Sequence, residues 1–252
     1  MNPDSPPAPD APEAMPPDAC GAGPTPPKIV LMEGFEDCKT DAVTDCPKWL
    51  RVAAGRELQL TSTWVHMGQK NLALSSFTMN GGTSLIHARL PLAEPPARVG
   101  ISLVYTPSGQ GMTYELVKDF AEFGLASLSP ASEYDLTPIF SVKGQDHKLF
   151  FDAAPGRPQP GERARGEIAF GSLDFAQPGA TAPIHTYVYI ELDFCDGVAN
   201  IHAGTTSPPA FRKQLPISKG KAGSFDALYI AGGAPNVTYI DNVTVEVLGP
   251  RQ

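Results

Sequence analysis

Hydrophobic and polar residues alternate along much of the chain, which is the period-two pattern of a β-strand with one buried face. Residues 98–106 and 184–194 show the alternation clearly. The predicted buried face of the first consists of Val99, Ile101, Leu103 and Tyr105. The second sets a buried face against a polar one, namely Val188, Ile190, Leu192 and Phe194 against His185, Tyr187, Tyr189, Glu191 and Asp193.

The alternation near the end of the chain draws attention to one carboxylate. In 237–248, Val243, Val245 and Val247 share a face, and by the same parity Asp241 lies with them. Burying a lone carboxylate is costly unless a cation or hydrogen-bond donors satisfy it. We therefore expect Asp241 to bind a cation or to accept backbone amides at a strand bend.

Helical periodicity is nearly absent, apart from 113–128, which fits a helix or a strand. The 24 glycines and 27 prolines punctuate the apolar runs, many in turn-like pairs such as Gly81-Gly82 and Gly232-Gly233. Many strands separated by turn signals predict an all-β protein, an antiparallel β-sandwich or jelly roll.

Composition divides the chain into two parts. Residues 1–27 contain ten prolines and few large apolar side chains, which predicts an extended Pro-rich tether. Residues 28–252 have the length of a single β-sandwich domain.

The charge and the lack of long apolar runs exclude several classes of partner. The net charge of −8, with no basic run, argues against nucleic acid. No apolar stretch approaches the roughly 20 residues of a transmembrane helix, and residues 1–20 lack signal-peptide character. We expect a bacterial extracellular, cell-surface or periplasmic protein whose signal segment is absent from this sequence. Acylation of Cys20, as in a surface lipoprotein, is an alternative for the tether.

The four cysteines are not spaced as a zinc site. A disulfide between Cys38 and Cys46 would close a seven-residue loop, and pairing Cys20 with Cys195 would use the other two. Four free thiols in a reducing cytosol are the alternative.

Motifs at both ends of the chain resemble the concanavalin A-like lectin/glucanase superfamily, which includes laminin-G-like domains and jelly-roll carbohydrate-binding modules. The matching segments are "GFE" (34–36), "HMGQKNLAL" (66–74) and "FDALYIAGG…VTYIDNVTVEV" (225–247). They cover about a quarter of 29–248 and specify fold better than activity, and 107–183 match nothing in that family.

The resemblance implies a structural Ca²⁺ held by Glu36 and Asp241 together with backbone carbonyls. Calcium takes six to eight oxygen ligands, which distant segments can supply. The alternative is that Asp241 accepts backbone amides and that the acids of 33–45 are solvated.

A catalytic interpretation rests on "ELDFCD" (191–196), which resembles the paired-carboxylate motif of laminarinase-type glycosidases. There Glu191 and Asp193 would act as the two carboxylates. Against it, the last motif position is Asp196 rather than Glu, and too little chain follows. The segment fits better as a hairpin that turns at Asp196-Gly197.

Two sets of residues are candidate sugar-binding platforms: Tyr187, Tyr189 and Glu191, and separately Trp64 with His66. We expect a non-catalytic, exported module that binds a polysaccharide or another cell-surface component. The alternatives are a glycoside hydrolase or polysaccharide lyase of the same fold, and a structural subunit of a cell-surface assembly.

Overall fold

The structure is a computed structural model. It describes residues 23–24, 26–51, 59–62, 65–74, 84–92, 96–107, 122–129, 132–145, 148–153, 165–169, 185–204, 211–217, 225–232 and 238–249. The predicted tether therefore falls almost entirely outside the described residues, as does most of the ambiguous 113–128 segment. The part of that segment that is described belongs to a strand, β7 (Glu122–Ser129).

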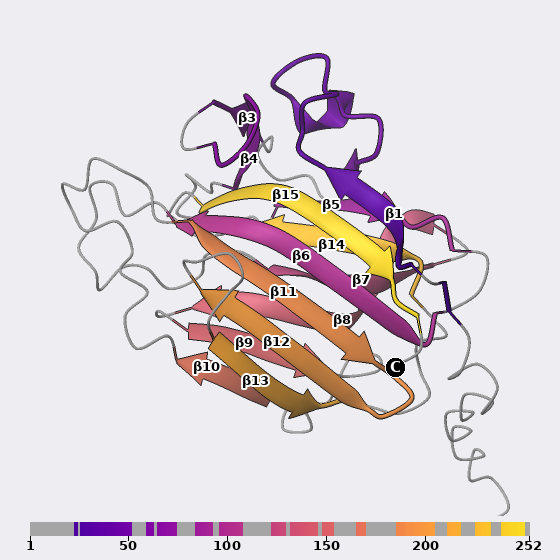
Figure 1. Cartoon of the computed structure of the whole chain (residues 1–252). Coiled ribbons are helices and arrows are strands. Elements are labelled where there is room, and N and C mark those ends of the chain that lie inside the picture. The colour runs from indigo at the N-terminus through magenta and orange to yellow at the C-terminus, as the bar shows by residue number, and fades with distance from the viewer. Residues whose placement is uncertain are drawn as a thin grey trace, which may run out of the picture.

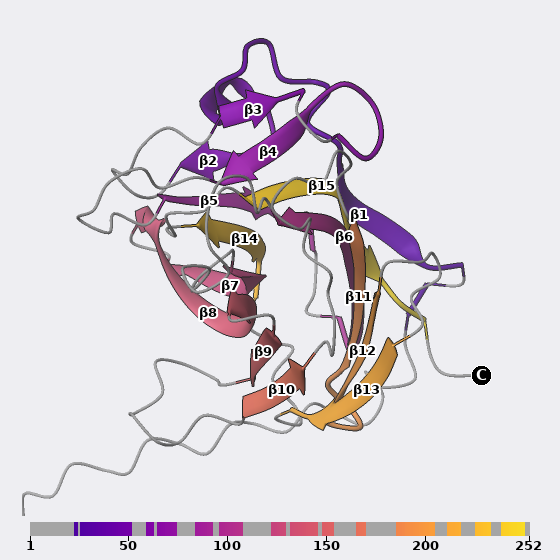
Figure 2. The ribbon, with the colours of Figure 1, turned by 90° about the vertical axis from the view of Figure 1, so that its left-hand side faces the viewer.

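Two antiparallel sheets are packed face to face, which confirms the predicted β-sandwich (Figures 1 and 2). Sheet A has the strand order β13-β12-β11-β6-β15-β4-β3, and β1 also pairs with β15. Its strands are β1 (Lys28–Glu33), β3 (Gln59–Thr61), β4 (Asn71–Leu74), β6 (Arg98–Pro107), β11 (Thr186–Asp193), β12 (Val198–Gly204), β13 (Phe211–Pro216) and β15 (Thr238–Val247).

Sheet B has the order β10-β9-β8-β7-β14-β5-β2. Besides β7, its strands are β2 (Leu50–Arg51), β5 (Ser84–Arg89), β8 (Ser132–Gln145), β9 (Lys148–Ala153), β10 (Arg165–Ala169) and β14 (Ala227–Gly232). A short 3-10 helix, η1 (Val43–Asp45), lies between β1 and β2.

The core between the sheets is formed by the alternating apolar residues of the strands. The faces predicted for 98–106 and 184–194 are confirmed, because the eight apolar residues predicted to face inward are all buried in one hydrophobic cluster. The alternate residues of β11, Tyr187, Tyr189 and Glu191, are half-buried on the other face of sheet A. We call this second surface the outer face. The hairpin predicted at Asp196-Gly197 is also present, between β11 and β12.

The parity argument for Asp241 is corrected by a β-bulge in β15. The register between β15 and β6 shifts between Asp241 and Thr244, so Ile240 and Val243 both reach the core. Asp241 pairs with Val104, which alternates with the core residues of β6. Residues directly opposite in an antiparallel pair point to the same face. Asp241 is buried as predicted, but on the outer face.

The disulfide predicted between Cys38 and Cys46 is present and closes the loop that carries η1. Cys195 is also disulfide-bonded. Its predicted partner, Cys20, lies outside the described residues. No cysteine in the described part of the chain is a free thiol, so the alternative of four free thiols does not hold.

Candidate functional site

His66 lies at the centre of a polar cluster on the outer face of sheet A. Its Nε2 is 2.8 Å from the Tyr187 hydroxyl, although the two residues are 121 positions apart. The rings of His66 and Tyr187 meet edge to face at 5.2 Å, and the His185 ring lies 5.0 Å from that of His66. The structure thus brings together one member of each predicted sugar-binding platform. Trp64, predicted beside His66, lies outside the described residues.

Asp241 holds the backbone next to His66. Its Oδ2 accepts the amides of His66 (3.0 Å) and Met67 (3.2 Å), and its Oδ1 accepts the amide of Asn242 at 2.7 Å. Burial raises the pKa of Asp241, and the amide hydrogen bonds together with nearby His66 oppose part of that rise. The carboxylate thereby fixes the start of the segment 66–70, which we call the His66 loop.

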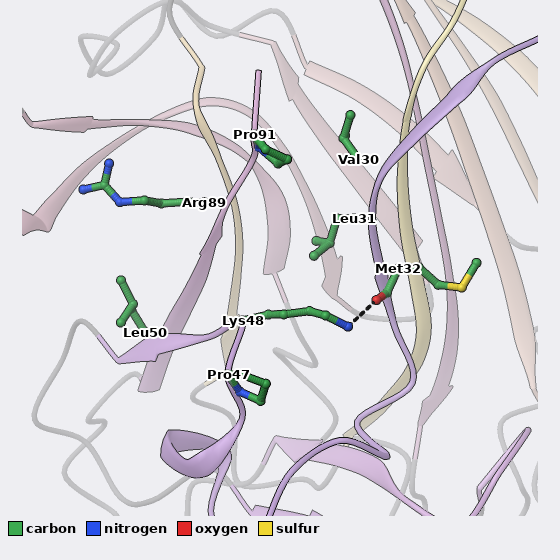
Figure 3. A pocket seen from close by; sticks show the side chains of 8 residues that line it. All are labelled: Val30, Leu31, Met32, Pro47, Lys48, Leu50, Arg89 and Pro91. Carbon is green, nitrogen blue, oxygen red and sulfur yellow. Dashed lines mark hydrogen bonds between the residues drawn. The ribbon is translucent and has the colours of Figure 1, made fainter. Parts of the chain in front are cut away.

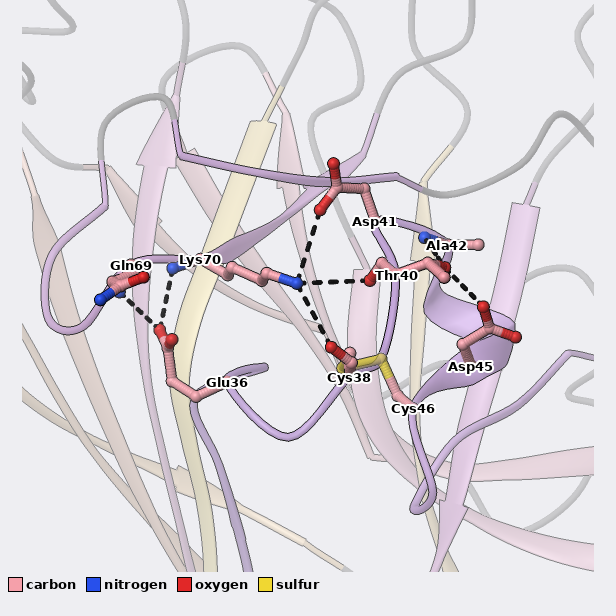
Figure 4. Close-up of polar contacts among 9 residues, drawn as sticks. All are labelled: Glu36, Cys38, Thr40, Asp41, Ala42, Asp45, Cys46, Gln69 and Lys70. Atoms are coloured by element: carbon pink, nitrogen blue, oxygen red, sulfur yellow. Dashed lines mark hydrogen bonds and ion pairs between the residues drawn. A yellow bond between two sulfur atoms is a disulfide. The ribbon is translucent and has the colours of Figure 1, made fainter.

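Glu36 holds the other end of the His66 loop (Figure 4). Its Oε1 accepts the amides of Gln69 at 2.7 Å and Lys70 at 2.8 Å. Gly68, between the two anchored ends, has φ +81°, and a Cβ there would lie 2.3 Å from Glu36 Oε1. The "HMGQK" motif therefore needs glycine at its centre, because Glu36 occupies the space of a side chain.

The other acids of 33–45 also have protein partners. Glu33 is buried and accepts the Trp49 indole N–H (3.2 Å), with the Lys48 ammonium 3.7 Å away. Lys70 reaches Asp41 at 3.5 Å and also donates to the carbonyls of Cys38 and Thr40 (Figure 4). Glu33 and Asp41 thus help to hold the segment 33–49 together and to join it to Lys70 of the His66 loop.

The predicted calcium ligands fit a cation poorly in this arrangement. Glu36 and Asp241 each direct an oxygen at two backbone N–H groups, which are positive ends of dipoles and would repel a cation. Within the described ranges, no three His, Cys, Asp or Glu side chains gather as a metal site. These contacts support the alternative in which Asp241 accepts backbone amides. Calcium binding stays a prediction with a direct test.

A second group on the outer face surrounds Tyr189. Its hydroxyl donates to Glu246 at 3.2 Å, and its ring lies 5.8 Å from that of His202. Burial and the neighbouring carboxylates of Glu246 and Glu191 raise the pKa of Tyr189 well above its ordinary value. Tyr189 therefore stays a neutral phenol and contributes an aromatic face.

The two weak catalytic candidates share one cation. The Arg98 guanidinium is 2.6 Å from Glu191 and 3.3 Å from Asp193. Asp193 is buried, and its Oδ1 also accepts the amides of Cys195 and Asp196 in the hairpin turn. These contacts assign Asp193 a structural role in the turn and support the hairpin interpretation over the catalytic one.

His185 completes the cluster beside Tyr187. Its Nδ1 is 2.8 Å from the hydroxyl of Thr106 on the neighbouring strand. Burial, and then the proximity of His66, lower the pKa of His185, so its neutral form is favoured. The sequence-based platforms left out His185, although its place on the polar face of 184–194 was predicted. They also left out Asn242, whose position depends on the bulge.

A separate apolar cavity of about 430 Å³ lies beside β1 (Figure 3). It is lined by Val30, Leu31, Met32, Pro47, Lys48, Leu50, Arg89 and Pro91. Lys48 donates to the Met32 carbonyl at 2.8 Å, so this carbonyl points away from β15 toward the cavity. Met32 and Leu50 are exposed, and among the described strands β1 pairs with β15 alone.

Three solved structures with a similar fold are a polysaccharide lyase, a mannose-bound lumenal domain and a CBM2 module. The endo-β-1,4-glucuronan lyase of the fungus Trichoderma reesei has a TM-score of 0.55 at 10% identity, covering 82% of this chain and 92% of its own. The exoplasmic/lumenal domain of VIP36 in its Ca²⁺/Man-bound form scores 0.53 at 8% identity, covering 87% and 93%. The CBM2 module of the evolved Dit protein of Lactobacillus casei BL23 phage J-1 scores 0.54 at 8% identity, covering 90% and 98%.

At these identities the likeness concerns the fold. No family model matches the sequence, and no curated protein matches it. No helix within the described ranges is long and apolar enough to cross a membrane. The strand order and these structural neighbours show that the chain has a jelly-roll β-sandwich fold, as predicted.

Proposed function

We propose that the chain is an exported, non-catalytic module that binds a polysaccharide through the outer face of sheet A. The observation that carries the proposal is the cluster formed by His66, Tyr187 and His185, with Tyr189 on the same face. Tyr187 and Tyr189 are two residues apart on β11, which places them about 7 Å apart along the strand. That spacing suits two contacts to one sugar chain.

The charges on this face support an uncharged glycan. Glu191 and Glu246 lie beside the tyrosines, while the guanidinium of Arg98 is already paired with Glu191 and Asp193. A uronate would meet the carboxylates of Glu191 and Glu246 at a Coulomb cost, and the other cation whose place on this face the register gives, Arg212, lies farther out, opposite His202 on β13. A neutral sugar offers hydroxyls that donate to these same carboxylates. The same reasoning weighs against the polysaccharide-lyase alternative for uronate polymers.

The test is calorimetric titration of neutral and uronate oligosaccharides into the purified chain. Tyr189→Ala is expected to abolish measurable binding, and Tyr187→Phe to weaken it about 3- to 10-fold, the range for one hydrogen bond. Leu50→Ala, in sheet B beside the β1 cavity, is the control and should leave the affinity unchanged. If Leu50→Ala removes binding while both tyrosine variants keep it, the ligand occupies the cavity and the proposed face is wrong.

The edge of β1 that no described strand covers favours a second candidate function, a subunit of a cell-surface assembly. Ile29 and Met32 are 50% and 59% exposed on this strand, beside the apolar cavity. An apolar strand edge is a template for pairing with another chain, here a second copy, which would have to displace Lys48 from the Met32 carbonyl. Sedimentation velocity at rising concentration should then show a dimer that Met32→Lys removes. A monomer at all concentrations would contradict this function and leave the carbohydrate proposal in place.

A further inference from the structure

Asn242 has an unusual backbone conformation next to the candidate site. Its φ of +50° lies in the left-handed region, and it sits within the β-bulge of β15. Asparagine tolerates this conformation better than most residues. Asp241 Oδ1 accepts the Asn242 amide, and the Asn242 side-chain Nδ2 lies 2.8 Å from His66 Nδ1. The bulge therefore directs the side-chain amide at one nitrogen of the imidazole.

The direction of this hydrogen bond decides where the imidazole proton lies. An amide Nδ2 can donate but cannot accept, so His66 Nδ1 must be the acceptor. In a neutral imidazole one nitrogen accepts and the other carries the hydrogen. The hydrogen of His66 is then on Nε2, which donates to the Tyr187 oxygen at 2.8 Å. The hydrogen of the Tyr187 phenol is not used by His66.

We propose that Asn242 is a positioning residue that fixes the Nε2–H tautomer of His66 and so turns Tyr187 into a hydrogen-bond donor toward the ligand. A phenol that accepts one hydrogen bond donates a stronger one, because successive hydrogen bonds polarise each other. The ligand group beside Tyr187 is then an acceptor. This last step rests on the proposed carbohydrate function.

The acceptor that best fits this position is the carbonyl of an acetamido group. A carboxylate is disfavoured by Glu191 and Glu246 on the same face, and a sugar hydroxyl is a weaker acceptor than an amide carbonyl. The site would therefore prefer an N-acetylated neutral sugar over its plain hydroxyl counterpart. The side chain next to His66 on this side is the imidazole of His185, which the lowered pKa keeps neutral, and not a charged group.

The positioning role is tested without any ligand by NMR of the full chain with ¹⁵N-labelled histidine. The two-bond couplings of a neutral imidazole distinguish the Nε2–H from the Nδ1–H tautomer. The wild-type His66 is expected as Nε2–H. Asn242→Asp, which places an acceptor at Nδ1, should move the hydrogen to Nδ1. Asn242→Gly keeps the left-handed backbone but removes the donor, and should give a mixture.

Two results would overturn the positioning role: an Nδ1–H tautomer in the wild type, or an Nε2–H tautomer unchanged in both variants. Circular dichroism of both variants verifies that the overall fold is kept. If Asn242→Asp fails to fold, Asn242→Gly alone decides the matter, because glycine suits the backbone.

The ligand step is tested with two neutral β-1,4-linked probes, an N-acetylglucosamine trisaccharide and the corresponding glucose trisaccharide. The wild type should bind the acetylated probe about 10-fold more tightly, as expected for one good hydrogen bond, and Tyr187→Phe should lose this preference. Equal affinity for both probes contradicts the acceptor argument. If neither probe binds while a broader set of glycans also fails, the proposed function falls, and the NMR result still decides the role of Asn242.

Discussion

Gly68 links a residue's conformation to the geometry of the site. Gly68→Ala must place a Cβ against Glu36 Oε1 at a positive φ, so the His66 loop has to shift. We expect a loss of about 1–3 kcal/mol in the free energy of unfolding, with weaker sugar binding. Gly34→Ala is the matched control, because its Cβ would meet atoms no nearer than 3.9 Å. Urea denaturation of both variants measures the difference, and equal losses would contradict the role of Gly68.

The contribution of Asp241 to folding stability depends on pH, and it falls as the pH rises, which is unusual for a carboxylate. Its pKa in the folded chain is raised by burial above the ordinary value of 3.8. Between these two values the folded state binds more protons than the unfolded state, so stability falls as the pH rises. The stability of the wild type relative to Asp241→Asn should therefore be greatest below pH 3.8 and decline through the raised pKa.

Urea denaturation of the wild type and Asp241→Asn across this range measures the pH dependence. Asp196→Asn, on the exposed hairpin turn, controls for the removal of one negative charge. A wild-type advantage that grows with pH would mean that the amide hydrogen bonds outweigh burial.

At this scale the sequence predicted individual residues well where strand parity is regular. The buried and polar faces of β11 follow directly from its alternation, so Tyr187, Tyr189 and Glu191 were correctly placed opposite the buried face, although the structure shows them half-buried. The contact between His66 and Tyr187 was not predicted, because it joins segments 121 positions apart through the packing of a loop on a sheet. The face predicted for Asp241 was wrong, because the bulge in β15 adds one residue and a period-two pattern does not reveal it.

At the scale of elements, the loop closed by Cys38 and Cys46 carries η1 and leads to Trp49, which stacks on Phe35. A disulfide that closes so short a loop stabilises the chain by about 2–3 kcal/mol through the entropy of the unfolded state. Replacing both cysteines by serine should lower the free energy of unfolding by that amount. Urea denaturation under non-reducing conditions measures the loss, and an unchanged free energy of unfolding would contradict it. The reduced wild type should lose more than the variant, because reduction also breaks the disulfide of Cys195.

The predicted calcium ion would join the start of the domain to β15 through Glu36 and Asp241, and its binding can be tested directly. The Glu36 and Asp241 carboxylates already accept four amides of the His66 loop, so a cation would have to displace them. We expect the thermal midpoint to be the same with millimolar Ca²⁺ and with a chelator. A ligand that binds the native state must raise the midpoint. A rise with Ca²⁺ that disappears in Asp241→Ala would instead establish the metal site.

At the scale of the whole molecule, a disulfide between Cys20 and Cys195 is predicted to join the N-terminal segment to the sandwich. Cys195 lies in the turn between β11 and β12. Cys195 is disulfide-bonded in that turn, where Asp193 Oδ1 accepts its amide at 3.1 Å. With Cys38 and Cys46 bonded to each other, Cys20 is the predicted partner. Such a bond would tie the predicted tether to the hairpin of β11, the strand that carries Tyr187 and Tyr189.

Non-reducing peptide mapping of the full chain should therefore recover one peptide pair that contains Cys20 and Cys195. Because that bond would close a loop of most of the chain, Cys195→Ser should lower the free energy of unfolding by about 2–5 kcal/mol. Cys20→Ser is the matched control, since it removes the same bond without touching the turn. A larger loss for Cys195→Ser than for Cys20→Ser would measure what the turn itself contributes. Disulfide-linked dimers through Cys195 would contradict the pairing and would favour the assembly function.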